Sequence, residues 1–226
     1  MPKRKCILIG NSSTNLDHEV GHLIDEYDFV VRFNSYVTTG FEKHVGTKQT
    51  VWAPNLGLVK HAPTCRKYLE MPNKYIWYVG NSYVTEEKLV RLKRTMKKQF
   101  TVESINFDVT TLANSLHYPE MEFIDGKVRF GKDRKYGTTG IRGVFKALNW
   151  FGEITIHGFT FYDEIDNGKH SHGHYYEEKH VPPHMHQAFN RHPIAEHDPQ
   201  AEKVVIGKLI RDGYIKELVP YLTKGE

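Results

Sequence analysis

Residues 6–15 read CILIGNSSTN: an apolar run of strand length passes directly into a turn of glycine, amide and hydroxyl side chains. A second apolar run, FVVRFN, follows at residues 29–34. In a parallel α/β sheet the carboxyl ends of neighbouring strands meet at one edge, where uncovered backbone N–H groups bind anions. The layout therefore predicts a nucleotide-binding crevice at this edge.

The candidate binding residues of this crevice are Gly10, Asn11 and Ser12 after the first strand, and Asn34 at the end of the second. Amide and hydroxyl side chains can hydrogen-bond a phosphate or a ribose. A plain strand-to-helix turn, with an N-cap among residues 12–14, explains the same side chains equally well. Both interpretations stay open at this point.

Apolar runs and amphipathic stretches alternate along the rest of the chain, a pattern typical of an α/β fold with a mostly parallel sheet flanked by helices. A turn is expected at Asp125-Gly126. The length suits a single domain, residues 1–226. Further strands are expected at 50–53, 75–79 and 154–157, and helices at 59–70, 86–98, 112–116 and 201–211, the last with Val204, Val205 and Leu209 facing inward.

A helix is also expected from Ile141 onward, since apolar residues recur there at helical spacing through Leu148. The same spacing predicts that Arg142, Lys146 and Asn149 face away from the core. The helix opens with the turn Tyr136-Gly137-Thr138-Thr139-Gly140, whose N–H groups and hydroxyls suit an anion. The strand at 154–157 ends in Gly158-Phe159, which predicts a second binding turn at the same edge.

Charge and cysteine content narrow the range of partners. The chain carries 31 Lys and Arg against 27 Asp and Glu, a net charge of +4 that is spread along the sequence. This fits an anionic small substrate, or peripheral contact with a membrane, better than a nucleic acid. Because only a strand-length apolar run follows the basic start, we expect no signal peptide or transmembrane anchor and a cytoplasmic protein. Two cysteines, Cys6 and Cys65, are too few for a disulfide framework, so both are expected to be reduced.

Histidines are concentrated near the end of the chain, where eight of the 14 lie within residues 170–197. The pairs His172/His174 and His184/His186 are candidate metal ligands, but no carboxylate or cysteine completes a ligand set. Acid–base chemistry is the second interpretation, because imidazole titrates near neutral pH. A solvated loop is the third.

Four segments in order carry a longer pattern: CILIGNSS through RFN to GFEKHVGTK (residues 6–48), YGTTGIRGVFKALNWFGEITIHGF (136–159), HYYE (174–177), and His197 followed after four residues by Glu202. Together they resemble the four sialylmotifs of the animal-type sialyltransferases, glycosyltransferase family 29. Taken singly the last two are weak patterns, but the order and the distances make the resemblance strong.

The resemblance implies a Rossmann-like fold of the glycosyltransferase A kind that lacks the Asp-x-Asp metal site. It implies inverting transfer of sialic acid from CMP-sialic acid to a glycan or glycolipid hydroxyl, without a metal or other cofactor. His174 would donate to the donor phosphate, His197 would be the general base, and Glu202 is expected to be structural. The implied nucleotide pocket comprises Gly10, Asn11, Ser12, Asn34, Tyr136, Thr138, Thr139, Gly140, Gly158 and Phe159.

This chain departs from the family pattern in three respects. Phe151 stands where the family has the second cysteine of a disulfide with the position of Cys6, and Gly137-Thr138 replaces the usual Pro or Ser. In contrast to the animal members, we also expect no membrane anchor or stem. CMP-3-deoxy-octulosonic acid is an alternative donor, since it is also a 2-keto sugar acid on CMP. Two further classes of protein fit parts of the sequence: a non-catalytic relative that only binds a CMP-sugar, and a His-rich metal-dependent hydrolase.

Overall fold

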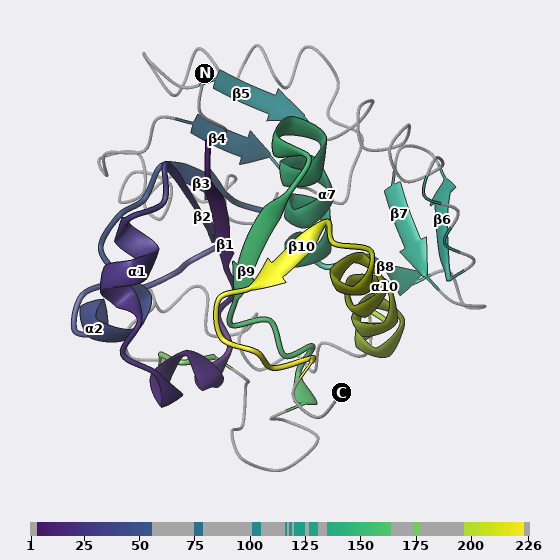
Figure 1. The fold of residues 1–226 in the computed structure, drawn as a ribbon. Coiled ribbons are helices and arrows are strands. Elements are labelled where there is room, and N and C mark those ends of the chain that lie inside the picture. Colours follow the sequence, from purple (N-terminus) through teal and green to yellow (C-terminus); the bar gives the residue numbers. More distant parts are fainter. Residues whose placement is uncertain are drawn as a thin grey trace.

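A computed structural model describes residues 4–55, 75–78, 101–104, 116, 118, 120–124, 127–130, 135–163, 174–176 and 197–223 of the chain. Its centre is a seven-stranded sheet in the order β10-β9-β1-β2-β3-β4-β5, in which every pairing is parallel (Figure 1). This confirms the predicted α/β class. The strands are β1 (Cys6–Ile9), β2 (Phe29–Phe33), β3 (Val51–Ala53), β4 (Tyr75–Tyr78), β5 (Thr101–Ser104), β9 (Ile154–His157) and β10 (Ile215–Glu217).

Strand β1 lies inside the sheet because both of its edges are paired. Ile7 is in register with Val30 of β2 on one side and with Thr155 of β9 on the other. All four residues of β1 are buried, which explains why its sequence is apolar throughout instead of alternating.

Helices cover both faces of the sheet, and the alternating side chains of β1 show which helix covers which face. Cys6 and Leu8 pack into one core with the helices α7 (Thr139–Phe151) and α10 (Pro199–Arg211). Ile7 and Ile9 pack into a second core with the short helices α1 (Gly21–Asp25) and α2 (Glu42–Val45). In Figure 1, α1 and α2 lie to the left of β1, and α7 and α10 lie to its right. A 3₁₀ helix, η1 (Ser13–Asp17), follows β1.

A separate three-stranded sheet precedes α7. Strands β6 (Met121–Ile124) and β7 (Lys127–Phe130) pair antiparallel, with Ile124 opposite Lys127, and β8 (Lys135–Tyr136) pairs with β7. This antiparallel pairing agrees with the turn expected at Asp125-Gly126, two residues that themselves lie outside the described part of the chain. The helices predicted at 59–70 and 86–98, and all but one residue of that at 112–116, lie outside the described residues.

The prediction for the outer face of α7 is confirmed for Asn149, which is exposed, and was wrong for Arg142 and Lys146. Arg142 and Lys146 are buried, as are the apolar residues of the same helix. Arg142 donates from Nη2 to the Gly137 carbonyl oxygen, and the Lys146 ammonium lies 5.4 Å from the centre of the Trp150 ring. Burial of these cations is possible because a carbonyl dipole and an indole face replace water around them.

The inward face of α10 also differs from expectation by one residue. Val205 and Leu209 are buried as predicted, but Val204 is exposed and Ile206 takes the buried position. The helix begins earlier than expected, because Asp198 caps it through a hydrogen bond from the Ala201 N–H (3.0 Å).

The polar residues around β2 and α2 contact the backbone. The carboxylate of Asp25 accepts hydrogen bonds from the N–H groups of Thr47 and Lys48 at 2.8–3.0 Å. Arg32, fully buried in β2, donates to the carbonyl oxygens of Lys48 (2.9 Å) and Val45 (2.6 Å). These side chains hold the loop after α2 against the sheet.

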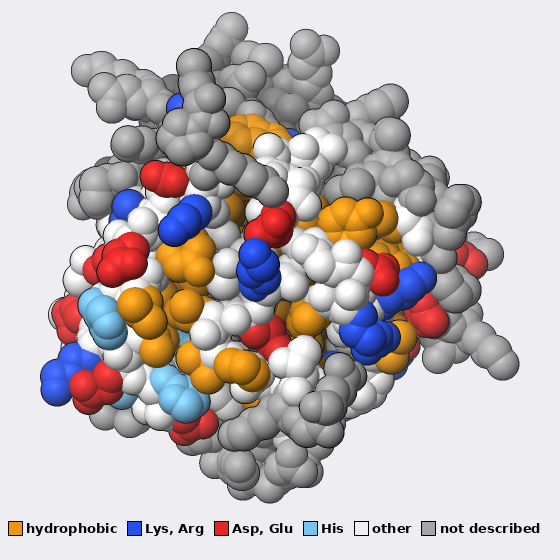
Figure 2. All heavy atoms as spheres, viewed as in Figure 1, with side chains coloured by type: hydrophobic (Ala, Val, Ile, Leu, Met, Phe, Trp, Pro, Cys, Tyr) orange, Lys and Arg blue, Asp and Glu red, His pale blue; other side chains and the backbone are white. Residues whose placement is uncertain are grey.

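Two further observations concern the surface charge and the length of the helices. Acidic and basic side chains are interspersed over the described part of the face in Figure 2. Among the residues that the structure describes, no helix is both long and apolar enough to span a membrane.

Candidate functional site

The turns predicted to bind a nucleotide lie where β1 and β9 end side by side. The Gly10 N–H donates to the His157 carbonyl oxygen (2.8 Å), and the Ser12 N–H donates to the Gly158 carbonyl oxygen (3.3 Å). A Cβ on Gly10 would lie 2.0 Å from the Gly158 oxygen. Only glycine allows the two turns to approach this closely.

Asn15 and Ser12 fix the turn after β1. The Asn15 side chain donates to the Gly10 carbonyl oxygen (2.8 Å), and Gly158, at φ +70°, leaves room for that amide. Ser12 Oγ accepts from the Thr14 N–H (3.1 Å) as the N-cap of η1. The capped turn predicted as an alternative is therefore present, and a contact of Ser12 with a ligand stays a prediction.

Residues 174–176 lie against this turn. Ser12 and His174 form an isolated antiparallel bridge, and the Tyr175 N–H donates to the Asn11 carbonyl oxygen (2.9 Å). The Asn11 amide nitrogen contacts the Tyr176 hydroxyl (3.3 Å) and the carbonyl oxygen of Phe33 (3.4 Å). The structure thus brings Asn11 and Ser12 together with His174, although about 160 residues of sequence separate them.

Asn34 ends β2 at the same edge in a left-handed conformation, φ +50°. Its carbonyl oxygen accepts from the Trp52 indole N–H (2.8 Å), and its side-chain oxygen accepts from the Asn55 N–H (3.0 Å). Because Oδ1 is engaged, the amide NH₂ is the group of Asn34 that suits an anionic ligand oxygen.

The amino end of α7 completes the edge. Thr138 is the N-cap and accepts from the Ile141 N–H (3.3 Å). A Cβ on Gly140 would lie 3.1 Å from the Phe159 ring, so the helix start sits directly on the turn after β9. Phe159 in turn meets Phe33 of β2 edge to face, with ring centres 5.9 Å apart. The predicted residues 138–140 and 158–159 are therefore neighbours.

His197 is held by the turn before α7. Its Nδ1 lies 2.7 Å from the carbonyl oxygen of Tyr136. Since a carbonyl oxygen only accepts hydrogen bonds, Nδ1 carries the proton in this contact. In the neutral imidazole Nε2 is then the basic nitrogen.

Glu202 is bound to the same turn. The Thr138 N–H donates to Oε1 (2.6 Å) and the Thr138 hydroxyl donates to Oε2 (2.7 Å). Burial raises the pKa of Glu202 to about 7, against the opposing effects of the two Thr138 donors and of Arg142. That Glu202 is structural stays a prediction, and its side-chain partner is Thr138 of the predicted binding turn.

The histidine pairs considered as metal ligands are only partly described. His174 lies beside Ser12, while His172, His184 and His186 lie outside the described residues. Within the part of the chain that the structure describes, no group of three or more His, Cys, Asp or Glu side chains could hold a metal ion.

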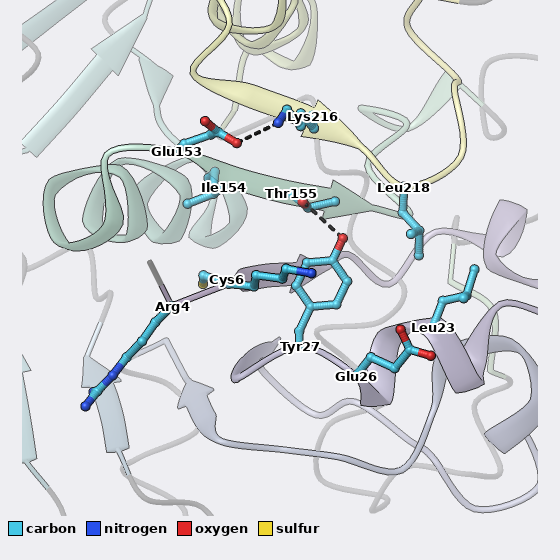
Figure 3. Close-up of a pocket in the computed structure, with 11 residues that line it drawn as sticks. Arg4, Cys6, Leu23, Glu26, Tyr27, Glu153, Ile154, Thr155, Lys216 and Leu218 are labelled. Atoms are coloured by element: carbon cyan, nitrogen blue, oxygen red, sulfur yellow. Dashed lines mark hydrogen bonds and ion pairs between the residues drawn. The ribbon is translucent and has the colours of Figure 1, made fainter. Parts of the chain in front are cut away.

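A pocket of about 420 Å³ lies where β1 and β9 begin, at the opposite end of these strands from the predicted binding turns (Figure 3). The Tyr27 hydroxyl points to Thr155 (3.2 Å), and Lys216 pairs with Glu153 (2.7 Å). None of the residues predicted for the functional site lines this pocket. The lining comprises Arg4, Lys5, Cys6, Leu23, Glu26, Tyr27, Glu153, Ile154, Thr155, Lys216 and Leu218.

Two residues that contact the predicted binding residues were missed in the sequence. Arg142 was assigned to the outer face of α7, although it binds the Gly137 carbonyl oxygen inside the binding turn. Tyr176 is buried and contacts Asn11, but in the sequence it was noted only as part of the HYYE motif. A cation one turn after a glycine-rich helix start was the available signal for Arg142.

The parallel sheet, with glycine turns and a capped helix start at its carboxyl edge, defines a Rossmann-like α/β protein of the glycosyltransferase A kind. The family model for glycosyltransferase family 29 (sialyltransferase) matches residues 1–214. The chain belongs to this family.

Individual relatives agree with this membership. Human lactosylceramide α-2,3-sialyltransferase is 23% identical over 231 residues, which cover 95% of this chain and 52% of the relative. The β-1,6-galactosyltransferase GALT29A of Arabidopsis thaliana is 24% identical over 168 residues, 68% of this chain and 42% of the relative. The chain thus spans about half the length of these relatives.

A solved structure of a mammalian sialyltransferase shares the fold. It superposes with a TM-score of 0.57 at 20% identity, and the match covers 95% of this chain and 68% of that one. The fold predicted from the sequence is thereby confirmed.

Proposed function

We propose that the protein is an inverting, metal-independent sialyltransferase that transfers sialic acid from CMP-sialic acid to a glycan hydroxyl. The single observation that carries the proposal is the hydrogen bond from His197 Nδ1 to Tyr136. It leaves Nε2 as the basic nitrogen at the edge where a nucleotide would bind. Membership of the sialyltransferase family supports the choice of donor.

On the donor side, the amino end of α7 and the turns at Gly10 and Gly158 would hold the CMP group. Backbone N–H groups at a helix start favour a phosphate. His174, beside Ser12, would donate a hydrogen bond to a phosphate oxygen as the leaving group gains negative charge. Because these donors stabilise the departing CMP, the step requires no divalent cation.

On the acceptor side, His197 Nε2 would take the proton of the acceptor hydroxyl. The hydroxyl oxygen attacks C2 of the sialic acid, the bond from C2 to the phosphate oxygen breaks, and CMP leaves with the electron pair. A single displacement of this kind inverts the configuration at C2. A solved structure of a mammalian sialyltransferase contains Gal-β-1-3GalNAc-ortho-nitrophenol, which suggests galactose-terminated acceptors for the first trials.

The test is release of CMP from CMP-sialic acid in the presence of a chelator and a galactose-terminated acceptor. We expect turnover in wild type, and a loss of about 100-fold or more in His197→Ala with CMP binding retained. His44→Ala is the matched control, because that imidazole binds the His18 carbonyl oxygen (3.0 Å) in the loop beside α2. Chelator-sensitive turnover would contradict metal independence and favour the metal-dependent hydrolase.

Two other donors belong in the same assay. CMP-3-deoxy-octulosonic acid with a lipopolysaccharide-type acceptor tests the second keto-sugar acid. A nucleotide-activated galactose is included because a plant galactosyltransferase matches 168 residues of this chain. Turnover with one of these and none with CMP-sialic acid would replace the proposed donor, and CMP binding without turnover would indicate a binding-only relative.

A further inference from the structure

The three successive residues Tyr136, Gly137 and Thr138, which precede α7, each form a hydrogen bond with a side chain. The three side chains belong to α7, to α10 and to the segment just before α10. His197 donates to the Tyr136 carbonyl oxygen, Arg142 donates to that of Gly137, and Glu202 accepts from the Thr138 N–H. His197 and Glu202 flank the start of α10, whose first turn is closed by the hydrogen bond from the Glu202 N–H to the Asp198 carbonyl oxygen (3.1 Å). The contacts form a closed ring that joins α10 to the binding turn.

We propose that Glu202 is a positioning residue for the base: its carboxylate fixes Thr138, and thereby the Tyr136 carbonyl that holds His197 in the Nδ1–H tautomer. This inference rests on the proposed function of His197. Glu202 does not touch the reacting atoms, so its effect reaches the reaction only through the turn at 136–138.

A carboxylate is required at this position because Thr138 presents two donors. The Thr138 hydroxyl already accepts from the Ile141 N–H, so its own proton must go to another acceptor, and Glu202 Oε2 supplies one at 2.7 Å. Hydrogen bonds from an N–H and an O–H to an ionised carboxylate are among the stronger ones in proteins. Glu202 is only 1% exposed, so water does not compete for these contacts.

Protonation of Glu202 weakens this hold, since a protonated Oε2 donates instead of accepting. The pKa of the group is about 7 because burial raises it, while Arg142 from α7 lowers it and Asp198 at the start of α10 raises it. The activity then depends on two protonations on the acid side, one at His197 and one at Glu202. We expect the logarithm of kcat to fall with a slope steeper than one as the pH drops.

The test compares Glu202→Ala and Glu202→Gln with the control Lys203→Ala. The control removes the ion pair between Lys203 of α10 and Asp163 (2.7 Å) and leaves the contacts of His197 and Glu202 with the turn in place. The measurements are kcat, the KM for CMP-sialic acid, the slope of the acid limb, and the ¹⁵N signals of the His197 imidazole, assigned with His197→Ala.

In Glu202→Ala we expect kcat to fall about tenfold or more, the donor KM to change less than about threefold, and His197 to populate both tautomers. Glu202→Gln keeps one side-chain oxygen, which accepts from the Thr138 N–H only. Its kcat should lie between those of wild type and Glu202→Ala. On the acid side of its pH–rate profile, the logarithm of kcat should fall with a slope of one. The kcat of Lys203→Ala should stay within about twofold of wild type.

The inference is overturned if Glu202→Gln keeps the wild-type slope and the wild-type tautomer, even if Glu202→Ala fails to fold. Absence of turnover in wild type with every donor would contradict the proposed function alone. The imidazole signals would then still decide whether Glu202 positions His197.

Discussion

At the scale of single residues, the approach of Gly10 to Gly158 is the tightest constraint on the crevice. Gly10→Ala would place a methyl group 2.0 Å from a backbone oxygen, so the ends of β1 and β9 must move apart. We expect the free energy of unfolding to fall by about 2–4 kcal/mol, measured by urea denaturation.

Gly213→Ala is the control for this substitution. Gly213 has φ +81° but open space around it, so a methyl group there incurs only the cost of the left-handed backbone, about 1–2 kcal/mol. A Gly10→Ala protein as stable as Gly213→Ala would show that the turns separate freely.

Two buried titratable residues act on stability in opposite directions. Burial, helped by the charge of His18, lowers the pKa of His157 from 6.5 to about 4. Its contribution is present above pH 6.5 and is lost as the pH falls through 4. The pKa of Glu202 is raised from 4.5 to about 7, so its contribution is present below pH 4.5 and is lost as the pH rises through 7.

Between pH 4.5 and 6.5 these two contributions therefore oppose one another. The buried neutral imidazole of His157 costs stability only where the unfolded chain would bind a proton, so stability rises with pH from 4 to 6.5. As the pH rises from 4 to 6.5, we expect the free energy of unfolding of His157→Gln to fall relative to that of wild type, by at most about 3 kcal/mol. Glu202→Gln should show the reverse trend from pH 4.5 to 7. Urea unfolding at a series of pH values measures both differences, and parallel curves for all three proteins would contradict the assignment.

At the scale of elements, Arg32 links β2 to the end of α2 through two carbonyl oxygens. Lysine offers one ammonium group in place of a planar fork and cannot reach both oxygens with the same geometry. Arg32→Lys should lower the free energy of unfolding by about 2 kcal/mol, seen as a lower melting temperature.

The exposed pair Lys43–Glu19 is the comparison for Arg32. Its side chains are 76% and 66% exposed, so Lys43→Ala should change stability by no more than about 0.5 kcal/mol. Equal losses of unfolding free energy in Arg32→Lys and Lys43→Ala would mean that the buried guanidinium contributes no more to stability than an exposed ion pair.

The sequence predicts the central strands and helices well because their buried side chains form apolar runs or recur at a regular spacing. Strands β1, β2 and β9 were located to within a residue, and α7 was recognised from its apolar stripe. The polar side of α7 was misassigned because periodicity says nothing about a carbonyl or an indole that receives a buried cation. Strand β10 was missed because Ile215–Glu217 contains a single buried apolar residue.

At the scale of the whole molecule, the candidate site combines segments that are remote in sequence. Motif residues such as Asn11, His174 and His197 were identified from their order along the chain, and the structure places them along one edge. The hydrogen bonds that join Glu202 and His197 to the turn at 136–138 were not predicted, because contacts between segments far apart in the chain have no sequence period. Local sequence patterns therefore predict helices and strands, whereas the candidate site depends on contacts between residues that are far apart in the sequence.

The central position of β1 has a consequence for synthesis on the ribosome. Its partner β2 emerges soon afterwards, but β9, which covers its other edge, emerges only after most of the chain has been translated. At about 5–20 residues per second this delay is on the order of 10 s. During that interval an apolar strand has one unpaired edge, so we expect the nascent chain to depend on ribosome-associated chaperones and to aggregate when translation stalls before residue 154.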